Sequence, residues 1–146
     1  MYFWLIFPGV FLADQASKLL ITGTMTLNHS IPVLTGIFHI TYIRNPGAAF
    51  GIMANRTPVF IVISLLVIAG IIFFYYRQGI KRGIIPSSLG LIAGGALGNL
   101  ADRVRFGEVI DFLDFRVWPV FNLADSAIVV GSALLVLAFW RMESKN

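Results

Sequence analysis

The stretch PVFIVISLLVIAGIIFFYY, from Pro58 to Tyr76, decides the fold class because it runs for 19 residues without a charge. A helix needs about 20 mostly apolar residues to cross about 30 Å of hydrocarbon. Three further segments meet this criterion, at about residues 1–21, 84–100 and 119–140. The first has no basic leader and no small-residue cleavage site, so we expect a retained helix and not a signal peptide. The sequence predicts an all-α membrane protein of four transmembrane helices, forming one domain over residues 1–146.

The composition agrees with this prediction. Hydrophobic residues make up 58% of the chain and charged residues 12%, whereas a soluble domain has roughly 45–50% apolar and about 25% charged residues. A soluble domain and a disordered chain are therefore excluded. The chain has no cysteine, which excludes disulfide scaffolds, thiol nucleophiles and thiolate metal sites. The formal charge of +4 is better explained by basic residues flanking the spans than by nucleic-acid binding.

Basic residues are densest in the short link RQGIKRG, residues 77–83, and they recur in the C-terminal tail. Density near span ends favours a cytoplasmic position for this link and for both termini. The longer segments, about 22–57 and 101–116, then lie outside. Within the first of them, residues 37–43 are rich in β-branched and aromatic side chains after a Thr35-Gly36 turn signal, and they predict a short strand.

A stripe of small residues in the third span predicts close helix packing. Gly90, Gly94 and Gly98 recur every four residues, which lets another helix approach in lipid. If the helix continues past residue 100, Asn99 and Arg103 share one face with Asp102. Asp102 and Arg103 could instead be solvated flanks.

Asp125 is the strongest single candidate for function. It lies in FNLADS, residues 121–126, at the start of the last predicted span, with Asn122 one turn before it. An acid inside a membrane costs several kcal/mol unless it faces a wet cavity or a partner. A salt-bridged structural acid is the alternative.

More carboxylates precede this span, in EVIDFLDF, residues 108–115. If the chain folds back, either Asp111 or Asp114 could pair with Asp125. Two adjacent carboxylates share one proton, so one acts as base and the other as acid. Such a pair can activate water to attack an amide carbonyl.

Other chemistries have less support. The chain has no HExxH motif, and its two histidines lack metal-ligand spacing, so we expect neither a metal nor a cofactor. Asp14 and Lys18 are four residues apart with the acid first, which favours a helical ion pair. That pair could be structural or could position the site, and the sequence does not choose between these roles.

Five blocks in order resemble lipoprotein signal peptidase (signal peptidase II), an aspartic endopeptidase of the bacterial cytoplasmic membrane. They are DQASK (14–18), NPGAAFG (45–51), GGALGNLADR (94–103), VIDF (109–112) and FNLADS (121–126). The resemblance implies cleavage of diacylglyceryl-modified prolipoproteins before the lipidated cysteine, inhibition by globomycin, and a monomer whose active site lies near the extracytoplasmic face.

The resemblance also assigns residues. It places the catalytic pair at Asp111 and Asp125, and supporting polar groups at Asn45, Gly47, Asn99, Arg103, Asn122, Asp14 and Lys18. It further implies a small extracytoplasmic β-sheet cradle, and a short surface helix near residues 47–53. Two rival classes predict different behaviour: a proton-coupled transporter subunit would use Asp125 as its relay, and a scaffold protein would tolerate loss of both acids.

Overall fold

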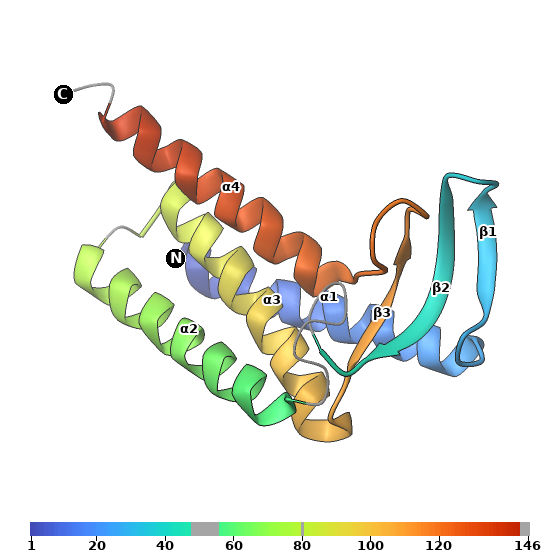
Figure 1. Ribbon diagram of the computed structural model, residues 1–146. Helices are drawn as coiled ribbons and strands as arrows, with labels where there is room; N and C mark the ends of the chain where they lie inside the picture. The colour runs from blue at the N-terminus through green and yellow to red at the C-terminus, as the bar shows by residue number, and fades with distance from the viewer. Residues whose placement is uncertain (48–55, 80, 144–146) are drawn as a thin grey trace.

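The computed structural model describes residues 1–47, 56–79 and 81–143. Four helices, each long and apolar enough to cross a membrane, form one bundle, with a three-stranded antiparallel sheet at one end (Figure 1). The helices are α1 (Tyr2–Thr24), α2 (Thr57–Gln78), α3 (Ile84–Phe106) and α4 (Leu123–Glu143). The strands are β1 (Ser30–Leu34), β2 (Phe38–Asn45) and β3 (Val109–Asp114), in that spatial order. The predicted fold class is confirmed.

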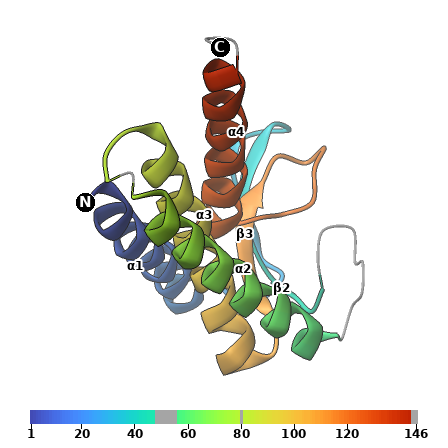
Figure 2. The ribbon, with the colours of Figure 1, turned by 90° about the vertical axis from the view of Figure 1, so that its left-hand side faces the viewer.

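Helix α3 is the centre of the bundle. Thirteen of its residues are buried, whereas Tyr75 is the one buried residue among those described in α2. In Figure 2, α3 lies between α1 and α2 and runs beside α4. The glycine stripe explains the close approach: a Cβ added at Gly94 would lie 2.6 Å from the Phe7 carbonyl oxygen of α1. The prediction of close packing is confirmed.

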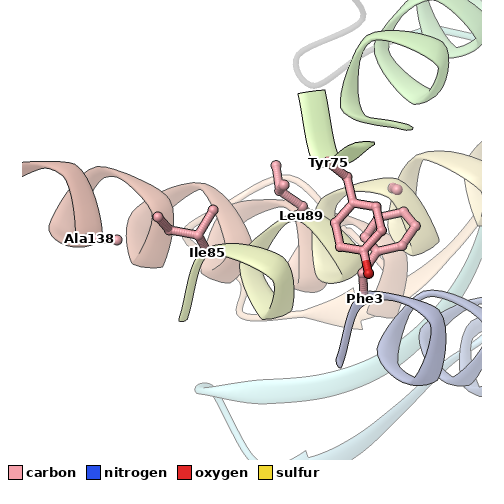
Figure 3. Close-up of a cluster of buried hydrophobic side chains, with 6 residues drawn as sticks. Phe3, Tyr75, Ile85, Leu89 and Ala138 are labelled. Atoms are coloured by element: carbon pink, nitrogen blue, oxygen red, sulfur yellow. The ribbon is translucent and has the colours of Figure 1, made fainter. Parts of the chain in front are cut away.

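The end of the bundle away from the sheet is closed by aromatic side chains. Phe3 stacks on Tyr75 with ring centroids 4.6 Å apart, and both pack with Ile85, Leu89 and Ala138 (Figure 3). This cluster joins all four helices. Most of the buried polar groups lie nearer the other end of the bundle, where the sheet is.

Helices α3 and α4 have different bounds from the spans predicted at about residues 84–100 and 119–140. Helix α3 continues to Phe106 because Asp102, which could have been a solvated flank, is buried at 1% exposure against α1. Helix α4 begins at Leu123 and not at residue 119, because Asn122 caps it. The segment from 101 to 116 therefore holds the last part of α3, to Phe106, and the whole of β3, Val109–Asp114.

The predicted strand at 37–43 is found as β2, displaced by one to two residues. Strand β1, which pairs with it as a hairpin, was not predicted. It contains Pro32, and proline is confined to sheet edges because it cannot donate to the ladder; β1 is indeed an edge strand. The expected surface helix near 47–53 lies, apart from Gly47, outside the described residues.

Candidate active site

Asp111 projects from the middle of β3 and is 2% exposed. The antiparallel register pairs it with Ile43 of β2, which brings Asn45 two residues further along the same strand within reach. Asn45 Nδ2 donates to Asp111 Oδ2 at 3.0 Å, and Asn122 Nδ2 donates to Asp111 Oδ1 at 2.7 Å. Both carboxylate oxygens are therefore held by amide donors.

Asp125 lies in the first turn of α4 and forms a capping box with Asn122. The Asp125 backbone N–H donates to Asn122 Oδ1 at 2.9 Å, and the Asn122 backbone N–H donates to Asp125 Oδ2 at 3.3 Å. This reciprocal pair satisfies two free donors at the helix start. It also places the carboxylate at the positive end of the helix dipole.

Two asparagine amides connect the carboxylates. Asn99 Nδ2 donates to Asp125 Oδ1 at 2.7 Å, while Asn122 Nδ2 also lies 3.1 Å from Asn99 Oδ1. Asn122 is fully buried and Asn99 is 7% exposed. This series of hydrogen bonds, from Asp111 through Asn122 and Asn99 to Asp125, links β3, the start of α4 and α3.

Lys18 of α1 lies behind these amides and is 2% exposed. Its ammonium group donates to Asp14 Oδ2 at 2.9 Å, to Asp102 Oδ2 at 2.8 Å and to Asn99 Oδ1 at 3.0 Å. The ion pair expected within α1 is confirmed, and it extends to α3. Asp14 Oδ1 also accepts the Ala124 backbone N–H at 3.0 Å, which fastens α1 to the start of α4.

A cavity of about 380 Å³ opens over both carboxylates. Arg103 lines it, with its guanidinium 4.7 Å from the centre of the Phe60 ring and Nη2 donating to the Gly47 carbonyl oxygen at 3.1 Å. The other lining residues are Asn45, Asn99, Val109, Asp111, Trp118, Pro119, Val120, Phe121, Asp125 and Val129. A cationic side chain and two acids therefore face one space.

The environment of Asp111 favours its protonated form. Burial, followed by the nearby charge of Asp125, raises the pKa of Asp111 to about 7, although the amides of Asn45 and Asn122 act in the opposite direction. Asp111 therefore keeps its proton to a higher pH than an ordinary carboxyl group does.

Asp114, the alternative partner, lies away from the cavity. Thr41 Oγ1 donates to its Oδ2 at 2.7 Å, and the Arg116 guanidinium pairs with the same oxygen at 2.9 Å. Burial acts to raise the pKa of Asp114, but these donors outweigh it and hold the pKa below its usual range. Asp114 stays ionised and binds Thr41 of the neighbouring strand and Arg116. It lies on the face of β3 opposite to that of Asp111.

Two contributors were missed by sequence reasoning. Asp102 was expected to share a helix face with Asn99 and Arg103 or to be a solvated flank, with no partner named, yet it binds Lys18 and accepts the Ile110 backbone N–H at 3.2 Å, which fixes β3 to α3. Phe60 carries no sequence signal, because its partner Arg103 is 43 positions away. Within the described ranges, no three His, Asp or Glu side chains are grouped as a metal site would require.

Comparison with known proteins supports a single family. The family model described as signal peptidase (SPase) II matches residues 6–141. A lipoprotein signal peptidase of Halothermothrix orenii is 53% identical over 92% of each chain, and one of Pelotomaculum thermopropionicum is 47% identical over 100% of this chain and 96% of that relative. A solved bacterial membrane enzyme superposes with a TM-score of 0.92 at 32% identity, covering 99% of this chain and 90% of its own. The chain therefore belongs to the signal peptidase II family, the lipoprotein signal peptidases of bacterial membranes.

Proposed function

We propose that this protein is an aspartic endopeptidase that cleaves diacylglyceryl-modified prolipoproteins before the lipidated cysteine. The observation that carries the proposal is the amide-linked pair of Asp111 and Asp125 at one cavity. Family membership supports prolipoproteins as the substrate class. The transporter alternative has no observation in its favour.

The proposed reaction needs one proton on the pair. The ionised aspartate takes a proton from water, and the water oxygen attacks the carbonyl carbon before the cysteine. The negative charge that develops on the carbonyl oxygen is stabilised by donors aimed into the cavity, and Arg103 is the cationic donor that lines it. The protonated aspartate then gives its proton to the leaving amine as the C–N bond breaks, which regenerates the pair.

The remaining polar residues have positioning roles in this proposal. Asn122 and Asn99 hold the two carboxylates, and Asn45 holds Asp111 and receives the Gly47 N–H on its own oxygen. Asp14 and Lys18 fix the elements behind them. We propose no metal or other cofactor.

We further propose that both termini are cytoplasmic, that the sheet is extracytoplasmic, and that the protein acts as a monomer. The basic link between α2 and α3 supports this orientation: Arg77 lies in the last turn of α2, Lys81 and Arg82 precede α3, and the C-terminal end of α2 and the start of α3 lie away from the sheet (Figure 1). The active site then lies near the outer face of the membrane.

The direct test is to incubate the purified protein with a diacylglyceryl-modified precursor and look for the shortened product. Asp111→Asn and Asp125→Asn should each abolish the product while still inserting in the membrane. Asp114→Asn is the matched control on the same strand and should retain activity. Globomycin should inhibit the wild type. Turnover by either active-site variant would refute the dyad.

A further inference from the structure

A second cavity, of about 570 Å³, adjoins the candidate active site. We call it the α4 groove. Its walls are formed by the segment before α4 and by the first two turns of that helix, at Phe115, Val117, Trp118, Phe121, Asp125, Ser126, Val129 and Val130. Trp118, Phe121, Asp125 and Val129 also line the active-site cavity. The two spaces therefore meet at one of the two acids.

The α4 groove is lined almost entirely by apolar side chains. Of its two polar residues, Ser126 already donates its hydroxyl to the Asn122 carbonyl oxygen at 2.9 Å, and Asp125 accepts from Asn99 and Asn122. A peptide segment placed here would bury backbone amides among apolar groups, which is costly. A hydrocarbon chain carries no such cost.

The direction of the groove also suits a hydrocarbon chain. Helix α4 starts at the sheet end and runs to the far end of the bundle (Figure 1). From Asp125 to Val130 the groove follows it for about 7 Å, at about 1.5 Å per residue, towards the middle of the span. Val129 and Val130 are 67% and 51% exposed on the outside of the bundle. The groove therefore leads from the acids into the hydrocarbon of the bilayer.

We propose that the α4 groove binds an acyl chain of the diacylglyceryl group on the substrate cysteine. This inference rests on the proposed function. Cleavage before that cysteine places its thioether only a few bonds from the carbonyl under attack, so the attached chain must leave the active site close to the acids. The groove begins at Asp125 and provides that exit.

The groove orients the substrate more than it adds affinity. Lipid tails are as apolar as the groove walls, so moving a chain from the bilayer into the groove gains little. A chain held there restricts the cysteine relative to Asp111 and Asp125, and small misplacements of a scissile bond slow catalysis strongly. Binding of the chain in the groove should therefore raise the rate of cleavage of lipidated substrates more than their affinity.

The first test fills the groove. Val130→Trp places a large ring in it, and Val136→Trp is the matched control because Val136 is 67% exposed on the same helix and does not line the groove. Two precursors with the same peptide carry dipalmitoyl or diacetyl groups, and the acetyl groups are too short to enter the groove. Val130→Trp should lower kcat/KM for the dipalmitoyl precursor about tenfold while cleaving the diacetyl one at the wild-type rate. The control should match the wild type on both.

Equal rates for Val130→Trp and Val136→Trp on the dipalmitoyl precursor would overturn the proposal. An equal loss on both precursors would also overturn it, since the ring would then block the active site and not the chain. Retained cleavage of the diacetyl precursor shows that the variant is folded.

The second test locates the chain directly. Precursors carrying a diazirine near the ester of an acyl chain, or in the apolar signal segment, are photolysed with the Asp111→Asn variant in vesicles, and the labelled peptides are mapped. The acyl probe should label residues 115–121 and 126–130. Labelling of the groove by the signal-segment probe, or by a phospholipid probe that excess precursor does not displace, would overturn the proposal. Wild-type cleavage of the same precursors, run in parallel, tests the proposed function separately.

Discussion

The Lys18 ammonium group donates to Oδ1 of Asn99 at 3.0 Å, and this contact determines which end of the Asn99 amide faces Asp125. Lysine has donors and no acceptor, so the Asn99 oxygen must point to it. The Asn99 nitrogen then points to Asp125 Oδ1, at 2.7 Å. A buried cation on α1 thereby orients a donor to an acid on α4.

Lys18→Met should lower both stability and activity. It leaves Asp14 and Asp102 buried without their cation, and breaking a buried ion pair costs about 3–5 kcal/mol. The Asn99 amide also becomes free to turn over, so cleavage should fall even where the variant stays folded. Thermal unfolding in detergent and precursor cleavage below the midpoint measure the two effects. Lys81→Met, at an exposed loop position, should change neither.

Activity should fall as pH rises through about 7. Burial and the charge of Asp125 raise the pKa of Asp111 to about 7, so above this value the proton that the pair shares is lost and the acid for the leaving amine is missing. The titration belongs to the coupled pair. A kcat profile against pH should therefore show an alkaline limb, which Asp114→Asn should keep. A flat profile from about pH 6 to about pH 9 would contradict the shared proton.

Gly98→Ala should destabilise the protein. A Cβ there would overlap Asp14 Oδ2 and lie 3.0 Å from Asp14 Cγ, so the carboxylate that binds Lys18 would have to move. Gly70→Ala, in α2, meets nothing within 4 Å and gains about 1 kcal/mol in helix propensity. Relative to the wild type, the midpoint of thermal unfolding should be lower for Gly98→Ala and higher for Gly70→Ala. Equal midpoints would show that α1 and α3 can move apart at no cost.

Phe60→Leu should reduce cleavage without unfolding the protein. The Phe60 ring lies under the Arg103 guanidinium at 4.7 Å, and such a contact contributes about 0.5–2 kcal/mol, so kcat/KM should fall by roughly tenfold. Phe73→Leu is the control on the same helix, at a side chain that is 68% exposed. If both variants cleave like the wild type, Arg103 does not depend on the ring.

The choice between Asp111 and Asp114 marks the limit of reasoning from residues alone. Their alternation along one strand put them on opposite faces, but it could not say which face meets the last helix. The register of β2 with β3 places Asn45 against Asp111, and the cap of α4 places Asn122 against the same carboxylate. Both contacts join segments that are distant in the chain.

The prediction for Asp125 was incomplete for a different reason, since the start of its helix was misplaced. Hydropathy placed it inside a span that began at residue 119, although N-L-A-D from Asn122 to Asp125 has the spacing of a capping box. The cap was readable from the sequence, and it starts α4 at Leu123. Asp102 and Phe60 were not readable, because their partners Lys18 and Arg103 are reached only through helix packing.

The sequence by itself determined the class of fold, the four spans, the small-residue face of α3 and a short list of polar residues. These follow from local hydropathy and spacing, since a bilayer imposes length and polarity on each segment separately. The tertiary structure added the contacts that hold Asp111 beside the cavity shared with Asp125, the hydrogen bond from Lys18 to Asn99, and the apolar groove that adjoins this cavity. Those facts depend on side chains from different elements meeting in three dimensions, which no single segment encodes.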